Sequence, residues 1–334
     1  MEPEDPPQEP PGEPAFAPDF ADVPPDHRSG YVALVGAPNV GKSTLLNRLL
    51  GTKLSIVTPK PSTTRHRVLG ILSAEPTDER PPYQIVFVDT PGVVRPRYRL
   101  HDLMMADVDR ALGDADVVVL LVDAAEGKLT HDARGAVERL ATVQAPVILA
   151  LNKVDLIRQE EALPLVERYA ALRAPGAPLD EAFDEILPLS AQTGVNVDRL
   201  LNLLVDRLPP GPPYYPRDQL SEHPERFFIA EIVREAVFYR YRDEVPYSTQ
   251  VNVVQYEERP GRKDFVACEI VVERESQKAI LIGKGGKALK ALGAAARQEV
   301  EAFLGRPVYL QLHVKARADW RNREGFLRSY GYGR

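Results

Sequence analysis

A glycine-rich turn between an apolar run and a helical pattern constrains this chain more than any other feature. The apolar run covers residues 31–35, and the helical pattern begins at Lys42. The turn itself reads Gly36-x-x-x-x-Gly41-Lys42-Ser43. Glycines let backbone N–H groups curl around phosphates, and the N-terminus of the following helix adds positive potential. A strand, this turn and a helix in direct succession predict a phosphate-binding loop rather than a chance glycine-rich turn.

The loop also carries the side chains that a bound nucleotide and its metal ion would need. We expect Lys42 to reach the β- and γ-phosphates and Ser43 to ligate Mg²⁺. The predicted nucleotide contacts of the loop are Gly36, Ala37, Pro38, Asn39, Val40, Gly41, Lys42, Ser43 and Thr44. Lys42 is also predicted to be catalytic, together with Thr64 and Gly92 from the two segments described next.

A second polar motif, Asp89-Thr90-Pro91-Gly92, follows the apolar strand predicted over residues 83–88. An acid at the C-terminal end of a core strand can hold Mg²⁺ directly or through water. The N–H of Gly92 could touch the γ-phosphate. We therefore predict that all four residues of this motif contribute to the nucleotide site. A polar strand end followed by an ordinary turn is the alternative.

The segment Pro-Ser-Thr-Thr-Arg-His-Arg at residues 61–67 lies between the loop and Asp89. A threonine hydroxyl here could bind Mg²⁺ when the γ-phosphate is present. The segment would then be a switch that GTP orders and hydrolysis releases. We favour Thr64 as the ligand, with Thr63 as its rival, and predict Ser43, Thr64 and Asp89 as the metal ligands. A capped polar loop is the alternative.

A third motif, Asn152-Lys153-Val154-Asp155, follows the strand predicted over residues 147–151. Guanine presents two N–H donors on one edge, and one carboxylate, that of Asp155, can accept both. A site built on such a pattern rejects adenine strongly. Asn152 and the stem of Lys153 would shape the pocket. Ser190 and Ala191, after the last strand, could offer a backbone N–H to the guanine oxygen.

The order of the predicted elements divides the chain. Apolar runs alternate with helical patterns over residues 29–208, which predicts an α/β domain with a mixed, mostly parallel sheet. Five prolines within residues 208–216 predict an extended, semi-rigid linker over 209–225. Residues 226–334 show the order helix–strand–strand–helix–helix–strand, an α+β domain. Nine prolines and eight acidic residues within residues 1–28 predict a disordered acidic tail.

Charge and composition narrow the class of protein. The chain carries a net charge of −6, yet residues 226–334 hold 20 basic against 14 acidic side chains. This excess favours contact with a polyanion. The single cysteine, Cys268, excludes a disulfide framework and a cysteine metal site. No apolar stretch approaches the roughly 18 residues of a membrane span, and no signal peptide is visible, so we expect a cytoplasmic protein.

The basic half contains Gly283-Lys284-Gly285-Gly286 between two predicted helices. A Gly-x-x-Gly turn of this kind, after two strands and with a third to follow, is typical of a type II KH domain, which clamps about four nucleotides of RNA. An ordinary helix–helix turn is the alternative. Trp320, in the basic tail, could stack on a base or anchor the C-terminus by packing. The predicted RNA contacts are Ile280, Ile282, Gly283, Lys284, Gly285, Gly286, Lys287 and Lys290, with the isoleucines as the groove floor.

These strings together resemble the bacterial Era GTPases over about residues 29–333. The resemblance rests on the segments 36–47, 63–67 and 89–92 and on the C-terminal half. It implies binding and hydrolysis of GTP with Mg²⁺, binding to 16S ribosomal RNA near its 3′ end, and a role in assembly of the 30S subunit and rRNA processing. It also implies peripheral membrane association for some members. We expect a monomer.

Two positions bear on the rate of hydrolysis. The resemblance implies that Asn39 helps to hold a monovalent cation, K⁺, beside the phosphates. Signalling GTPases place a water-orienting glutamine after the Asp-x-x-Gly motif, where this chain has Val93. Because valine cannot polarise water, we predict slow hydrolysis.

Three alternatives remain open at this point. The chain could serve RNA modification beside a partner enzyme, it could be an RNA-binding scaffold with a structural nucleotide, or it could regulate the cell cycle at the membrane. We expect GTP to change how the KH domain is presented to RNA.

Overall fold

The computed structural model describes residues 23–127, 130–170 and 183–333. In its N-terminal half one sheet has the strand order β2-β3-β1-β4-β5-β6, and β2 is antiparallel to β3 while the other described pairs are parallel. The mixed, mostly parallel sheet predicted from the sequence is confirmed. Its strands are β1 (Arg28–Gly36), β2 (Val68–Ala74), β3 (Tyr83–Asp89), β4 (Val117–Asp123), β5 (Val147–Asn152) and β6 (Glu185–Pro188).

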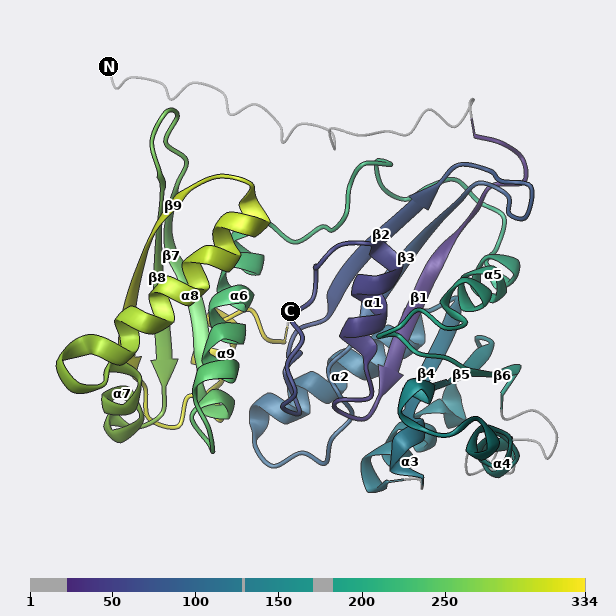
Figure 1. Cartoon of the computed structure of the whole chain (residues 1–334), viewed down its shortest axis with the longest axis horizontal. Helices are drawn as coiled ribbons and strands as arrows, with labels where there is room; N and C mark the ends of the chain where they lie inside the picture. The colour runs from purple at the N-terminus through teal and green to yellow at the C-terminus, as the bar shows by residue number, and fades with distance from the viewer. Residues whose placement is uncertain (1–22, 128–129, 171–182, 334) are drawn as a thin grey trace, which may run out of the picture.

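Helices cover both faces of this sheet (Figure 1). Strands that are buried on both faces read as continuous apolar runs, as β4 does. The carboxyl ends of β1, β3 and β5 meet at one edge of the sheet, where ligands of such folds bind. One face carries α1 (Lys42–Leu50) and α5 (Val197–Arg207), and the other carries α2 (Arg99–Asp114), α3 (His131–Arg139) and α4 (Gln159–Ala170).

The C-terminal half shows the predicted order of elements. Strands β7 and β8 are antiparallel, β8 and β9 are parallel, and α6, α7 and α8 pack on this sheet. Cys268 is buried in this core. The elements are α6 (Glu225–Arg240), β7 (Gln250–Glu257), β8 (Asp264–Val272), α7 (Glu275–Ile282), α8 (Lys287–Leu304), β9 (Val308–Ala316) and α9 (Glu324–Ser329).

The proline-rich linker between the halves is fastened to the first sheet. The side chain of Gln84 accepts hydrogen bonds from the N–H groups of Tyr214 and Tyr215 at 2.7 and 2.9 Å. Farther along, Ile71 N–H of the edge strand β2 donates to Leu220 O at 2.9 Å. These bonds hold the linker against β3 and the edge strand β2, and its extended form stays a prediction.

The start of β1 lies inside the segment predicted as a disordered tail. Strand β1 begins at Arg28, and His27 exchanges hydrogen bonds with Gly211 of the linker at 2.8 and 2.9 Å. These bonds explain why order begins before residue 29. Residues 1–22 of the predicted tail lie outside the described residues.

The chain end returns between the two halves (Figure 1). After β9, Trp320 is buried, and its indole N–H donates to Ser248 O at 2.9 Å. Leu100 N–H at the start of α2 donates to Arg321 O at 2.9 Å. The ring of Tyr332 stacks on His66, with ring centroids 4.2 Å apart. Trp320 is thus the packing anchor, and the tail binds the protein's own surface.

The basic face expected in this tail is partly neutralised. Arg321 pairs with Glu273, and Lys315 pairs with Glu269. In the described parts of the chain, no helix combines the length and the apolar composition needed to cross a bilayer.

Candidate nucleotide and RNA sites

The phosphate-binding loop connects β1 to α1 and has the backbone geometry that its glycines permit. Gly41 has φ of 100°, and a Cβ there would lie 2.2 Å from Nδ2 of Asn152. That amide donates to Val40 O at 2.7 Å, while Asn152 Oδ1 accepts from Ala191 N–H at 2.9 Å. Asn152 therefore ties the loop to the Ser190-Ala191 turn.

This arrangement changes the role expected for the Ser190-Ala191 turn. The N–H of Ser190 donates to Val195 O at 3.0 Å, and that of Ala191 is bonded to Asn152. A guanine oxygen would have to compete with Asn152 for the Ala191 N–H.

Lys42 is folded back into the loop. Its ammonium donates to Gly36 O at 3.0 Å and to Ala37 O at 2.9 Å. Burial lowers the pKa of Lys42 to about 8, and the nearby Asp89 carboxylate acts in the opposite direction. The two carbonyl oxygens accept the hydrogen bonds that the ammonium group could otherwise donate to phosphate oxygens.

The three predicted metal ligands meet in space. Ser43 Oγ lies 2.9 Å from Thr64 Oγ1 and donates to Asp89 Oδ2 at 2.6 Å. Thr63, the rival ligand, instead bonds Thr58 Oγ1 at 2.7 Å and Lys60 O at 2.9 Å. The geometry favours Thr64 over Thr63.

The oxygen atoms around Asp89 fit a divalent cation. Asp89 is fully buried, and burial raises the pKa of its carboxyl group against the effect of the Ser43 hydroxyl. Among the described residues, neither Asp89 Oδ1 nor the Ser55 hydroxyl has a hydrogen-bond partner. Ser55 is nevertheless close enough to Asp89 to lower the pKa of its carboxyl group. A buried carboxylate oxygen without a partner, next to two hydroxyls, is a donor set that Mg²⁺ accepts.

The Asp89-Thr90-Pro91-Gly92 motif packs directly on the loop. A Cβ at Gly92 would lie 2.8 Å from Pro38 Cα, so only glycine fits there without a shift. The Thr90 hydroxyl donates to Leu34 O of β1 at 2.8 Å and faces away from the site. Val93 is buried in the core and donates its N–H to Gly36 O at 3.0 Å.

At the base-binding end, Lys153 has φ of 67° and pairs with Asp123 at 2.6 Å. Asp155 is exposed at the start of the next turn. Sequence reasoning missed Asp123, since only the strand order β4–β5 brings its carboxylate to Lys153.

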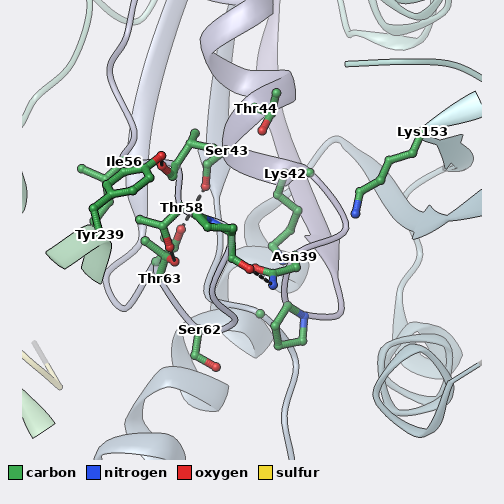
Figure 2. A pocket seen from close by; sticks show the side chains of 16 residues that line it. Asn39, Lys42, Ser43, Thr44, Ile56, Thr58, Ser62, Thr63, Lys153 and Tyr239 are labelled. Atoms are coloured by element: carbon green, nitrogen blue, oxygen red, sulfur yellow. Dashed lines mark hydrogen bonds between the residues drawn. The ribbon is translucent and has the colours of Figure 1, made fainter. Parts of the chain in front are cut away.

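A cavity of about 410 Å³ joins these groups (Figure 2). Figure 2 shows Tyr239 beside Ile56 on one side and Lys153 on the other. Tyr239 belongs to α6 in the other half of the chain, so no local pattern could have marked it. Of the predicted residues, the cavity is lined by Pro38, Asn39, Gly41, Lys42, Ser43, Thr44, Thr64, Gly92 and Lys153. The lining does not include the other predicted residues, which are Gly36, Ala37, Val40, Asp89, Thr90, Pro91, Asn152, Asp155, Ser190 and Ala191.

In the second half, the Gly-x-x-Gly turn has the geometry of a close approach. Gly283, Gly285 and Gly286 have φ of 68°, 61° and 76°. A Cβ at Gly283 would lie 2.6 Å from Ala288 Cβ. The side chains of Lys284, Lys287 and Lys290 are exposed around the turn.

A groove of about 460 Å³ opens beside this turn, between α8 and β9. Its lining includes Gly286 and Lys290 but neither Ile280 nor Ile282. Ile280 lies on α7 and is 51% exposed. Contact of Ile280 and Ile282 with RNA stays a prediction, and the apolar lining of this groove comes from Leu289, Leu310 and Leu312. Alternation along residues 308–314 was the signal that could have found the last two.

The comparisons with known proteins agree with these two sites. The family model described as a 50S ribosome-binding GTPase matches residues 31–153, and the KH domain model matches residues 244–321. The chain is 48% identical to "GTPase ERA-like, chloroplastic" of Arabidopsis thaliana over 313 residues, which are 92% of this chain and 69% of that protein. This chain belongs to the Era family of GTPases. A chloroplastic ERA-like GTPase of Oryza sativa is also 48% identical, over 92% of this chain and 70% of the relative.

Solved Era structures share the whole two-part fold. A variant of Aquifex aeolicus Era bound to GDP·AlF₄⁻ superposes with a TM-score of 0.82 at 40% identity, covering 91% of this chain and 99% of that one. An Era complex with MgGDPNP and nucleotides 1506–1542 of 16S ribosomal RNA gives 0.83 at 41% identity, covering 92% and 99%. The α/β GTPase domain followed by a KH domain is therefore the Era architecture, and the chain is a GTPase.

Proposed function

We propose that this GTPase is a slow, GTP-timed switch that binds small-subunit ribosomal RNA near its 3′ end and assists assembly and rRNA processing of the small subunit. The observation that carries the proposal is the presence, on one chain, of three gathered metal ligands and a lysine-rimmed KH groove. An Era structure 41% identical to this chain holds MgGDPNP and 16S RNA together.

For the nucleotide, we assign the phosphates to the loop and to Lys42. Its ammonium would exchange the carbonyls of Gly36 and Ala37 for phosphate oxygens, which are stronger acceptors. The N–H of Gly92 would face the γ-phosphate, since Gly92 packs on Pro38. Ser43, Thr64 and Asp89 would hold Mg²⁺, and bound Mg²⁺ would supply positive charge opposite the phosphates.

For the base, we assign guanine selection to Asp155. Its exposed carboxylate can accept two N–H donors, and Lys153, held by Asp123, walls the same end of the cavity. An adenine would leave that carboxylate without its donors, at a cost that explains strong discrimination.

Hydrolysis in this site would be slow and assisted by K⁺. Val93 is buried and apolar, so no side chain at that position can orient the attacking water. Asn39 Nδ2 donates at 3.0 Å to Pro59 O, two residues before the predicted switch segment. This contact fixes the Asn39 side chain beside the loop, and we assign its amide oxygen as a ligand of the monovalent cation.

For RNA, we assign the phosphate backbone to Gly283–Gly286 and the bases to the groove between α8 and β9. The exposed lysines at 284, 287 and 290 supply the charge. Tyr309, which lines the groove and is 58% exposed, offers a ring on which a base can stack.

The finer assignments of partner and place are part of the same proposal. We take the 30S particle as the target and a monomer as the acting form, with peripheral membrane association as a further property. Two relatives carry the word chloroplastic in their names, so the compartment of this chain is best tested directly by fractionation.

The experiment combines phosphate release with RNA mapping. We expect the full-length chain to release phosphate from GTP slowly and to crosslink in cells to the 3′ end of small-subunit rRNA. Lys287→Glu should abolish the crosslink, whereas Lys278→Glu, on the surface of α7 beside Glu275, should keep it. Crosslinks scattered over messenger RNAs would contradict the ribosomal role, and crosslinks to a modified RNA site would favour RNA modification.

A further inference from the structure

The connection between α1 and β2, residues 51–67, contains the predicted switch and is called the switch segment from here on. Asn47 of α1 holds its start through Leu54 and Ser55, and the KH domain supplies further partners. Val57 lies in this segment and lines the nucleotide cavity. Its N–H donates to Glu235 Oε1 at 2.9 Å, and its carbonyl accepts from the Tyr239 hydroxyl at 2.8 Å. Both acceptor and donor belong to α6. One helix of the KH domain thus bonds both backbone polar groups of one residue, Val57.

Glu235 is placed to make this contact strong. Its side chain is 5% exposed, and its second oxygen pairs with Lys53 at 2.7 Å. A charge-assisted bond in a shielded position is about twice as strong as a neutral one. Lys53 also approaches Glu299 of α8 at 3.3 Å, but both of those groups are about half exposed.

The far end of the segment is held by the same domain. The Lys60 ammonium donates to the carbonyls of Phe238 and Tyr241, at the C-terminal end of α6, where a cation is favoured. Arg65 is buried and donates to the carbonyls of Thr249, Pro246 and Tyr247 at 2.7, 3.1 and 2.9 Å.

The metal ligand lies between these two attachments. Thr58, next to Val57, bonds Thr63, and Thr64 reaches Ser43 at 2.9 Å. Thr64 precedes Arg65 directly. Fixing Val57 and Arg65 therefore fixes the path of the chain that delivers the Thr64 hydroxyl.

We propose that Glu235 and Tyr239 of the KH domain are positioning residues for GTP hydrolysis, which hold Val57 so that Thr64 stays at the metal site. The inference rests on the proposed function of Thr64 as a ligand that acts in the GTP state. GDP needs the phosphate loop and the guanine contacts but not Thr64. The two side chains must therefore favour GTP over GDP, and bound GTP must in turn favour this docking of α6.

The test compares variants of the full-length chain by their relative affinity for a GTP analogue and for GDP. Glu235→Ala removes the Val57 acceptor and one partner of Lys53. Its matched control, Glu299→Ala, removes the other partner of Lys53 and leaves Val57 untouched. Glu235→Gln keeps an acceptor for the Val57 N–H. Tyr239→Phe deletes one hydroxyl of a residue that is 61% exposed, so we expect this variant to fold as the wild type does.

We expect Glu235→Ala to weaken binding of the GTP analogue about tenfold and to slow hydrolysis, with GDP affinity unchanged. Tyr239→Phe should lower the affinity for the GTP analogue about threefold. Glu235→Gln should recover part of the affinity lost in Glu235→Ala, and Glu299→Ala should match the wild type. Equal weakening of GTP-analogue and GDP binding in Glu235→Ala overturns the positioning role. Wild-type behaviour of the double variant, which carries both Tyr239→Phe and Glu235→Ala, overturns it as well. A wild-type chain that neither hydrolyses GTP nor binds the RNA overturns the proposed function instead.

Discussion

The phosphate-binding loop and the switch segment border the same cavity, but different parts of the chain hold them. The loop is supported within the GTPase domain, by Lys42, by Thr90 and by Asn152. The switch segment is supported from the KH domain, at Val57 and at Arg65. We infer that binding of any guanine nucleotide is a property of the first domain, while recognition of the γ-phosphate state depends on both.

The largest expected effect concerns the loop. Lys42→Ala removes an ammonium that would make at least two charge-assisted bonds to phosphate. We expect GDP and GTP affinity to fall together by about a thousandfold, from roughly 2 kcal/mol per bond. Titration with a fluorescent GDP analogue measures this. Retained GDP affinity would contradict the inference that the loop of the first domain carries nucleotide binding.

The next effect separates the two regions. Thr64→Ala removes the candidate ligand of the switch segment and leaves the loop intact. We expect hydrolysis to slow about thirtyfold, for a loss of roughly 2 kcal/mol, with GDP affinity unchanged. Thr63→Ala is the control, because its hydroxyl faces Thr58 and Lys60 rather than Ser43. A larger loss in Thr63→Ala than in Thr64→Ala would reverse the assignment.

A smaller effect should appear where the two regions touch. Asn39 of the loop donates to Pro59 O of the switch segment. We expect K⁺ in place of Na⁺ to speed hydrolysis several-fold, on the order of 1 kcal/mol, and Asn39→Ala to remove the difference. Steady-state phosphate release in matched chloride salts measures it, and equal rates in the two salts for the wild type would exclude a cation role.

The smallest expected effect concerns His101, which lies close enough to Arg65 of the switch segment to interact with its charge. The ring of His101 in α2 lies 3.9 Å from that of Tyr98 and is tilted by 33°, and its Nδ1 is buried with no hydrogen-bond partner in the described chain. Burial lowers the pKa of His101 to about 4, and Arg65, Arg321 and Arg97 add to this while Asp102 opposes it.

Because this folded-state pKa lies below the unfolded value, neutral His101 favours the folded chain above pH 6.5. That contribution is lost as the pH falls toward 4. We expect the melting temperature to fall between pH 6.5 and 5, and His101→Phe to flatten part of this slope. An identical slope in the variant would remove His101 from the account.

The same contrast explains what could be predicted from the sequence. The loop, Asp89 and Asn152 follow strands directly, so local order places them at one sheet edge. The Gly283–Gly286 turn was equally local. Both were found because glycine backbone geometry and a strand end leave a signature within a few residues.

What the sequence did not reveal depends on contacts between distant segments. Glu235 and Tyr239 lie in α6, most of which is buried, and no nearby sequence feature marks the segment that they contact. Asp123 meets Lys153 only through strand pairing. The groove beside the Gly283–Gly286 turn is lined by side chains of α8 and β9 that lie apart in the sequence. Each of these depends on tertiary packing, which no single segment encodes.

The coupling between the two domains is tested most directly by one binding measurement on the full-length chain. The affinity for the 1506–1542 segment of 16S rRNA is measured with a non-hydrolysable GTP analogue, with GDP and without nucleotide. If the KH domain holds the switch segment that GTP orders, affinity must be highest with the GTP analogue, by about tenfold or more over GDP, a coupling in the usual range for linked sites. Equal affinity in all three states would contradict the coupling of the two domains.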